Sequence, residues 1–448
     1  MLAGTVPNRR LKVSHVVVAL LWGGLFALPF GDILNVSGLS LALAALTLFV
    51  GALTATFSCR YMRSDPHSGH FFLTLGLLVV SVLVFVLSTN LLLFALGWCA
   101  SGWLLAKLVG HVRSWPEAQA ARRRTCLSFL VGDSGLVAAL IILALHANSL
   151  DLATALERSM ELSPNILALV TMALIASAAA RCALPPFSGW LMSSMTAPTP
   201  VSALMHAGLV NAGGFLLLRF APLFEAAPLS RYTAVTLGLI AAVWGIGVMV
   251  VRSDIKGSIA GSTIAQMGFM IMSCGLGAYS AALWHLVAHG LFKAWLFLGS
   301  GSAIGMTSNK HSNLISHRCA GVIAGLAVVG AGLAVFSGQT NGEVIPLTLG
   351  MVTAAATLTS IGGIKILRTT RLWLVALIIV LVSFNIGGFM LAREAMGHDG
   401  PDLLGPWTLL ALLSAFLASW LWQRGRFVAR KPLSSGLYVH LLNSGALR

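Results

Sequence analysis

The sequence predicts an all-α, polytopic membrane protein with about fourteen transmembrane helices, and two observations lead to this fold class. Of the 448 residues, 57% are hydrophobic and 9% are charged, whereas a soluble globular protein carries about 25% charged residues. Apolar runs long enough to cross a bilayer recur along the chain. We expect spans near 15–30, 38–58, 71–88, 90–110, 124–147, 165–183, 199–219, 233–251, 257–276, 280–304, 318–336, 343–366, 371–391 and 404–422, within a single transmembrane domain of residues 1–448.

Membrane topology accounts for the net charge of +15. If the N-terminus is cytoplasmic, nearly all Lys and Arg residues fall in cytoplasmic segments, as the positive-inside rule requires. The opposite segments collect acids instead, namely Asp151, Glu157, Glu161, Glu225, Asp399 and Asp402. We therefore expect both termini on the cytoplasmic side, and the basic excess requires no nucleic-acid partner.

The expected span at 280–304 carries three ionisable side chains on one face. His285, His289 and Lys293 are spaced four residues apart, so on an α-helix they form one stripe about 12 Å long. A lysine in mid-membrane costs about 3 kcal/mol or more, and imidazoles titrate near neutral pH. We interpret the stripe as a proton path with Lys293 as its switch, because burial disfavours the charged ammonium. The alternative is a polar stripe that joins helices by hydrogen bonds.

Two segments interrupt the helical pattern. Pro185, Pro186, Pro198 and Pro200 lie among apolar residues in the stretch 184–200, which a continuous helix does not tolerate. The stretch 336–346, FSGQTNGEVIP, separates two further apolar runs. Broken helices about 150 residues apart are typical of an internally repeated transporter, with ion sites near the breaks.

Two ionisable residues lie near the first break. His206 follows it by one to two turns, so an open cavity there would expose its ring. Asp133 lies about two turns into the span that begins near 124 and needs a partner, for which Lys107 and Arg181 are the candidates.

The remaining candidates lie nearer the helix ends. Asp254, next to Lys256, should cap a helix start. Lys107 and Lys365 are placed where a long side chain can reach the membrane surface. Glu343, in the second break, is either a loop residue or a port for ions.

The motifs do not indicate an enzyme. Two histidines four apart can hold zinc, but Leu286 follows His285 where a hydrolytic HExxH motif has glutamate, and no third ligand is visible nearby. No nucleotide-binding loop or haem motif occurs in a convincing context. We therefore expect a transporter subunit with no cofactor in this chain.

Three stretches carry a family resemblance: ALPPFSGWLMSSMTAPTPVSALMHAGLV (183–210), SDIKGSIAGSTIAQMGFM (253–270) and HLVAHGLFKAWLFLGSGS (285–302). They resemble the antiporter-like proton-translocating subunits of respiratory complex I, above all subunit L, with relatives in Mrp antiporters and membrane-bound hydrogenases. The resemblance implies two inverted five-helix repeats, at about 71–219 and 233–391, each with a broken helix. It also implies a midplane chain of Lys, His and Glu residues, with family positions at His206, His285, His289 and Lys293.

The chain departs from the family at three places. The family usually has Trp-Glu where this chain has Trp98-Cys99. It has a lysine shortly before the Leu-Pro, where this chain has Arg181, and arginine does not give up its proton. It has a lysine or acid in the second broken helix, where this chain reads Ser337-Gly338-Gln339. Unless Arg181 substitutes, the Glu–Lys pair of the pumping subunits is missing.

This simplified pattern favours a DabB-type subunit of a two-component inorganic-carbon uptake system. The resemblance then implies a cation-conducting, most simply proton-conducting, subunit in the bacterial inner membrane. Its expected partner is a large peripheral DabA-type protein on the cytoplasmic side, similar to a β-carbonic anhydrase and holding zinc. The alternatives are a proton-pumping subunit of a complex I, hydrogenase or Mrp-type complex, and a structural membrane anchor for a catalytic partner.

Overall fold

A computed structural model describes residues 8–27, 36–300, 317–336, 342–362, 368–429 and 434–443. Nearly all of them are helical. The longer helices are α1 (Asn8–Ala27), α2 (Gly38–Tyr61), α3 (Ser68–Leu87), α4 (Leu91–Val109), α5 (Pro116–Ala147), α7 (Pro164–Arg181), α12 (Pro228–Val251), α13 (Ile255–Leu276), α14 (Tyr279–Gly299), α15 (His317–Phe336), α16 (Val344–Gly362), α17 (Arg368–Met396) and α18 (Pro406–Ala429).

The shorter helices lie at the interruptions and connections. They are α6 (Leu152–Arg158), α8 (Ser188–Ser193), α9 (Thr199–Ala207), α10 (Ala212–Arg219), α11 (Ala221–Glu225) and α19 (Ser435–Leu442), with 3-10 turns η2 (Ser159–Glu161), η3 (Ser194–Thr196) and η4 (Leu209–Asn211). The predicted all-α fold class is therefore confirmed.

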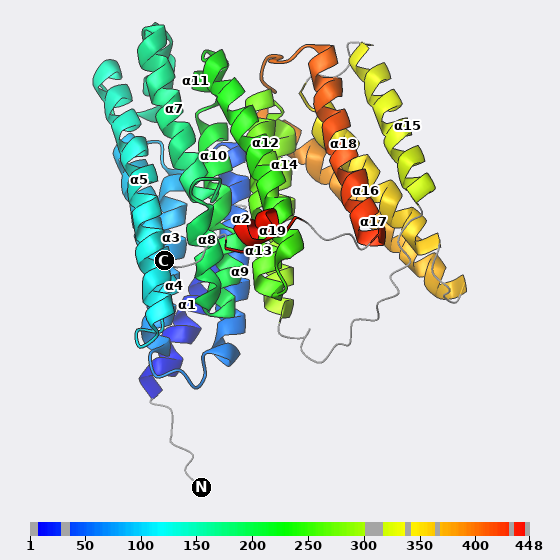
Figure 1. The fold of residues 1–448 in the computed structure, drawn as a ribbon. Helices are drawn as coiled ribbons and strands as arrows, with labels where there is room; N and C mark the ends of the chain where they lie inside the picture. Colours follow the sequence, from blue (N-terminus) through cyan, green and yellow to red (C-terminus); the bar gives the residue numbers. More distant parts are fainter. Residues whose placement is uncertain are drawn as a thin grey trace.

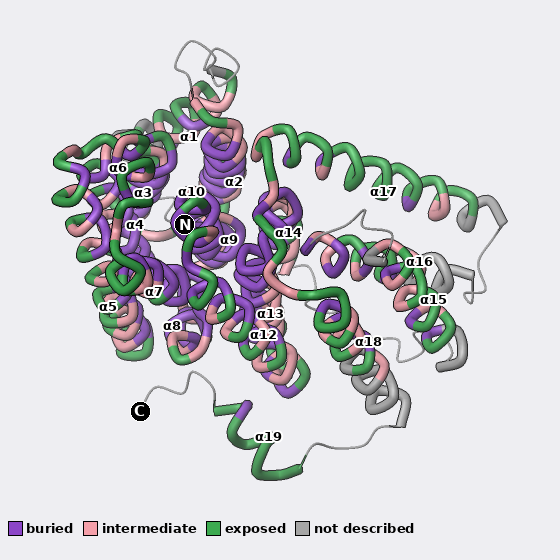
Figure 2. Tube along the Cα trace, turned by 90° about the horizontal axis from the view of Figure 1, so that it is seen from above, coloured by how far each residue is buried: buried purple, intermediate pink, exposed green. Residues whose placement is uncertain are grey.

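The helices form three groups (Figures 1 and 2). Helices α3–α8 make one side of the molecule, while α2, α9, α10 and α12–α14 form its centre. Helices α15–α18 stand on the far side of α12 and α13. One continuous apolar core joins the first two groups, and a smaller core joins α12 and α13 to α15, α16 and α18. Burial is accordingly deepest in the first two groups (Figure 2).

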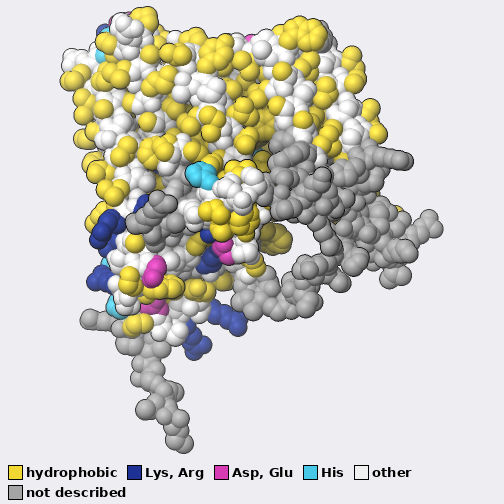
Figure 3. Space-filling model, viewed as in Figure 1, with side chains coloured by type: hydrophobic (Ala, Val, Ile, Leu, Met, Phe, Trp, Pro, Cys, Tyr) yellow, Lys and Arg dark blue, Asp and Glu magenta, His cyan; other side chains and the backbone are white. Residues whose placement is uncertain are grey.

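The molecule is a multi-pass membrane protein by the composition of its helices. Within the described ranges, ten helical segments are long and apolar enough to cross a bilayer, and four shorter apolar helices accompany them. Apolar side chains cover most of the height of the face seen in Figure 3, and Lys and Arg gather at its lower end. Each of the predicted span ranges overlaps a helix of the structure. The count of fourteen spans and the division into two repeats stay predictions.

Helices α12 and α13 approach each other through glycines. A Cβ added at Gly238 would come within 2.5 Å of the Gly268 carbonyl oxygen, and one added at Gly261 within 2.7 Å of the Met249 nitrogen. Membrane helices lack a strong hydrophobic drive to associate, so small residues that allow close contact determine where they pack. The glycines therefore allow close packing of α12 on α13, the helix that contacts Lys293 in the candidate site.

One predicted boundary was wrong, and one predicted span has an interruption inside it. Helix α5 begins at Pro116 and not near 124, because proline fits the first turn of a helix and the basic residues 122–124 extend the helix beyond its apolar part. The expected span 199–219 is also not one continuous helix. Gly208 and η4 separate α9 from α10, and hydropathy does not detect such an interruption inside an apolar segment.

The predicted break at 184–200 is present. Helix α7 ends at Arg181, and only the short α8 and η3 precede α9 at Thr199. Cys182, Ala183 and Leu184 are fully buried, in keeping with the rule that non-helical backbone at membrane depth must be enclosed by protein. Of the second predicted break, residues 337–341 lie outside the described residues.

Candidate functional site

Helix α14 carries the stripe predicted from the sequence. The rings of His285 and His289 stack with centroids 5.9 Å apart. His289 is 4% exposed and Lys293 is 0% exposed, while His285 is only partly buried. The three side chains therefore follow one face of α14 into the protein interior, with Lys293 the most enclosed.

Lys293 contacts neutral oxygens of α13. Its Nζ donates to the Ile259 carbonyl at 3.2 Å and to the Ser262 hydroxyl. Within the described part of the chain, Lys293 forms no ion pair with a carboxylate. A buried ammonium held only by neutral acceptors is stabilised less in its charged form than one paired with an acid. This environment suits a lysine that changes protonation state.

His206, on α9, reaches the same turn of α13 as Lys293. Its Nδ1 lies 3.1 Å from the Thr263 hydroxyl, and its ring stacks on Phe297 of α14 at 4.2 Å. The Thr263 hydroxyl donates its single proton to the Ile259 carbonyl at 3.0 Å. It can therefore only accept from His206, so Nδ1 carries a proton and Nε2 is the basic nitrogen.

The Ile259 carbonyl connects the two ionisable groups. It accepts from both Lys293 and Thr263, and Thr263 in turn accepts from His206. Among the described residues, His206 Nε2 and both ring nitrogens of His289 are buried without a hydrogen-bond partner. Buried polar atoms of this kind are rare unless water or another group satisfies them. These nitrogens belong to α9 and α14, the helices that carry His206 and Lys293.

The interruption between α9 and α10 packs directly on α14. A Cβ added at Gly290 would come within 2.6 Å of the Ala207 carbonyl, so glycine is needed for this approach. Asn211 donates to the same carbonyl at 2.8 Å and to the Leu286 carbonyl at 3.3 Å. The amide thus satisfies the backbone freed by the break and ties it to the helix that carries the stripe.

A second polar centre joins α4, α5 and α7. Arg181 donates to both carboxylate oxygens of Asp133, at 3.0 and 3.2 Å, and to the Trp98 carbonyl at 2.7 Å. The Trp98 indole donates to Asp133 at 2.8 Å. The guanidinium also stacks on Trp98 and Phe129, 4.7 and 4.5 Å from their ring centroids. Of the two partners considered for Asp133, the structure therefore selects Arg181.

Lys107 does not take part in that centre, because it lies in the last turn of α4, beyond Trp98. Its Nζ sits 3.3 Å above the Trp103 ring, at an exposed edge of the molecule. Lys256 lies at the start of α13, where Asp254 caps the helix as predicted, and its Nζ donates to the Ala197 carbonyl in the first break. Lys365 lies outside the described residues.

Glu343 meets an acid that the sequence did not indicate. Burial first, and then the neighbouring Asp399 carboxylate, raises the pKa of Glu343 to about 7. Asp399 also accepts hydrogen bonds from the Ser280 backbone N–H at 2.9 Å and from its hydroxyl at 3.2 Å. The acid pair therefore stands against the first turn of α14, the helix that carries the stripe.

Sequence reasoning missed the neutral residues that connect the site. Ser262, Thr263 and Asn211 lie in or next to the motifs quoted above, so their polarity inside apolar segments was the available signal. Asp399 gave no comparable signal, because it lies in a polar loop far along the chain. Among the described residues, no three His, Cys, Asp or Glu side chains lie close enough together to hold a metal ion.

Comparison with known proteins agrees with this architecture. Residues 88–360 match the family described as NADH:quinone oxidoreductase/Mrp antiporter, transmembrane, and residues 24–72 match the N-terminus of chain 5 of NADH-ubiquinone oxidoreductase (complex I). The first match covers more than half of the chain. The protein is thus an antiporter-like membrane subunit, and it belongs to the NADH:quinone oxidoreductase/Mrp antiporter family.

Individual relatives show which members of this family the chain resembles. The chain is 40% identical over 302 residues to the probable inorganic carbon transporter subunit DabB1 of Halothiobacillus neapolitanus, covering 66% of this chain and 52% of that protein. It is 34% identical over 309 residues to NADH-quinone oxidoreductase subunit L of Mycobacterium tuberculosis, covering 68% and 48%. The chain thus spans about half the length of these two relatives.

A solved structure shares the fold. A chain of the Mrp complex from Dietzia sp. superposes with a TM-score of 0.64 at 22% identity, over 96% of this chain and 55% of that one. The resemblance predicted from the sequence, to the antiporter-like family and to its DabB-type members, is therefore confirmed.

Proposed function

We propose that this chain is the cation-conducting, most simply proton-conducting, membrane subunit of a two-component inorganic-carbon uptake complex. The ion flow through it energises a partner protein that handles CO2 or bicarbonate. The chain itself catalyses no reaction and holds no cofactor.

The environment of Lys293 is the observation that carries the proposal. Its ammonium is fully buried and bonded to neutral oxygens of α13, so charging it is costly and reversible deprotonation is favoured. His206 and His289 lie beside it with unpartnered ring nitrogens, and a histidine can both accept and donate a proton near neutral pH.

The outer end of the path is the carboxyl pair of Glu343 and Asp399. Because Asp399 caps the first turn of α14 through Ser280, protonation of the pair changes the charge at the end of the helix that carries the stripe. The residues from Ser280 to Lys293 span about 20 Å at 1.5 Å per residue. Water or side-chain movement must therefore carry the proton between the pair and His285.

The DabB relatives support the choice of complex. We propose that the partner is a large peripheral DabA-type subunit, similar to a β-carbonic anhydrase and containing zinc, on the cytoplasmic side of a bacterial inner membrane. Both termini of the chain then lie in the cytoplasm, in agreement with the distribution of Lys and Arg. The whole assembly, and not this chain alone, would take up inorganic carbon.

Purification with partners and metal analysis test the proposal. The tagged chain is expected to co-purify with a large soluble protein holding zinc in stoichiometric amount. Expression of both is expected to restore growth at low CO2 in cells that lack carbonic anhydrase. Co-purification of iron–sulfur subunits, or of several other antiporter-like subunits, would contradict this proposal and favour a respiratory or Mrp-type complex. Uptake that persists when proton flux is abolished would instead favour the anchor function.

A further inference from the structure

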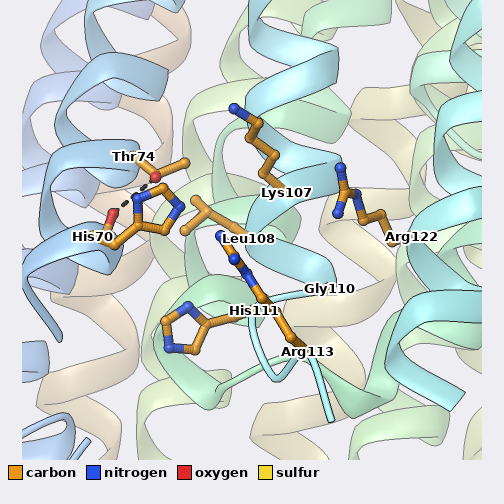
Figure 4. A pocket seen from close by; sticks show the side chains of 8 residues that line it. All are labelled: His70, Thr74, Lys107, Leu108, Gly110, His111, Arg113 and Arg122. Carbon is orange, nitrogen blue, oxygen red and sulfur yellow. Dashed lines mark hydrogen bonds between the residues drawn. The ribbon is translucent and has the colours of Figure 1, made fainter. Parts of the chain in front are cut away.

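A pocket of about 100 Å³ lies at the end of the bundle where α3 begins and α4 ends, away from the α14 stripe (Figure 4). Three helices, α3, α4 and α5, and the loop after α4 bring polar and basic groups around it. Its lining residues are His70, Thr74, Lys107, Leu108, Gly110, His111, Arg113 and Arg122. Figure 4 shows His70 and Arg122 on opposite sides of the pocket, with the Arg113 side chain reaching between them from the loop.

The lining is strongly cationic and contains no acid. Lys107, Arg113 and Arg122 are basic side chains, and within the described ranges none of them forms an ion pair with a carboxylate. Arg113, Lys107 and His111 all lie close enough to His70 to act on it electrostatically. One carboxylate, Asp65, contacts the lining residue His111; the remaining like charges repel one another, so this arrangement favours a bound anion.

The cations are held in place by packing. A Cβ added at Gly110 would come within 2.8 Å of Arg122 Cδ, so the glycine makes room for the arginine stem against the loop. Gln119 donates to the Gly110 and Val112 carbonyls, at 3.0 and 3.2 Å, and fixes the loop that carries Arg113. His111 Nε2 lies 3.0 Å from Asp65, which orients its ring. The pocket is therefore formed by ordered elements.

The surroundings of the pocket match the boundary between a membrane and water. Trp103 and Trp115 are 55% and 48% exposed, and Leu73 and Leu77 on α3 are exposed next to the pocket. Tryptophans gather at membrane interfaces, and basic pockets between helices on the cytoplasmic side recognise phosphate head groups. Arginine suits phosphate because its planar guanidinium can donate two parallel hydrogen bonds.

We propose that this pocket binds a phosphate group, supplied either by an anionic phospholipid or by inorganic phosphate, through Arg113 and Arg122, with the Lys107 stem in its lining and the Lys107 ammonium over Trp103. Thr74 and His70 provide further polar contacts at its rim. Phosphate binding at this site does not depend on proton conduction along α14. If the phosphate proposal fails, the proposed function is therefore unaffected.

The test compares the wild-type chain with Arg113→Gln and Arg122→Gln in nanodiscs. Arg123→Gln is the matched control, because Arg123 is exposed on the same turn of α5 and does not line the pocket. Native mass spectrometry measures retained phosphatidylglycerol, and phosphorus NMR in phosphatidylcholine discs measures bound inorganic phosphate. Loss of one charge-assisted contact should weaken binding about tenfold or more, with no change for the control.

Each outcome either tests the proposal or identifies the source of the phosphate group. Selective retention of phosphatidylglycerol that inorganic phosphate does not displace identifies the lipid head group as the ligand. Saturable binding of inorganic phosphate in phosphatidylcholine discs identifies the free anion. If both pocket variants bind each probe as the control does, the proposal is overturned. Arg122→Lys, which keeps the charge, should retain part of the affinity if the variant Arg122→Gln fails to fold.

Discussion

Arg181 and Lys293 are both fully buried basic residues, but their surroundings differ in kind. Arg181 forms an ion pair with Asp133 and stacks on two aromatic rings. Among the described residues, Lys293 Nζ donates only to neutral oxygens, and the side chain lies beside histidines with unpartnered nitrogens. Arginine keeps its charge under all physiological conditions, whereas a desolvated lysine can lose it. The first centre is thus a fixed charge pair, and the second is the one for which we propose a change of charge.

This difference suggests that the two helix groups have different functions, one structural and one in proton movement. The Arg181–Asp133 pair occupies the region where the family usually has its Glu–Lys pair, and it joins α5 to α7 at the first break. A permanent pair stabilises the break but cannot pass a proton. Proton movement would then be confined to the centre around α13 and α14.

The largest expected effect is that of Lys293→Ala, which should reduce proton flux in reconstituted vesicles to background. A pH-sensitive dye inside the vesicles measures the flux, and unchanged insertion serves as the folding control. Lys293→Arg sharpens the result, because arginine keeps the charge but does not release its proton. Substantial flux in the Lys293→Arg variant would show that Lys293 anchors α13 and does not switch.

Asp133→Asn should destabilise the protein by about 3 kcal/mol, because it leaves the Arg181 charge buried without its partner. Thermal unfolding in detergent measures the loss. Asp151→Asn is the control: Asp151 caps α6 at the surface, and asparagine caps a helix equally well. A proton-transfer function for the pair would appear instead as lost flux at unchanged stability.

His206→Asn should lower proton flux about tenfold, since proton transfer by a positioned histidine typically contributes at least this much. The exposed His146 on α5 supplies the control variant His146→Asn, which should conduct normally. The flux of both variants is measured in the same vesicle assay. Equal flux in the two would remove His206 from the path and leave it as a packing partner of Phe297.

Glu343→Gln should have the smallest effect, and it should depend on pH. Because the pKa of Glu343 is raised to about 7, folding favours its protonated form, and ionisation destabilises the native state as the pH rises from the ordinary carboxyl range through 7. Glutamine removes this dependence, so the variant should gain stability relative to wild type with rising pH, by under about 1 kcal/mol after solvent screening.

The measurement for Glu343→Gln is the thermal unfolding temperature between pH 5 and 9, in buffers of matched ionic strength. Glu394→Gln, an exposed acid on α17, should follow the wild-type pH dependence. A constant difference between the Glu343→Gln variant and wild type across this range would contradict the proposed outer carboxyl pair.

Properties that depend on near neighbours along the chain could be predicted from the residues alone. Apolar runs predicted the helices, and the four-residue spacing put His285, His289 and Lys293 on one face of α14. The prolines predicted the first break, and Asp254 was expected to cap α13, as it does. These features follow from the helical repeat and from backbone sterics, which act within a few residues.

Contacts between residues far apart in the sequence could be seen only in the tertiary structure. It paired Arg181 with Asp133 and not with another acid, brought His206 to Thr263, and set Glu343 against Asp399. It also revealed the interruption at Gly208, where α9 and α10 pack on α14. Such contacts depend on how each helix is rotated and where its glycines allow close approach, and hydropathy along one helix does not encode the rotation of its neighbour.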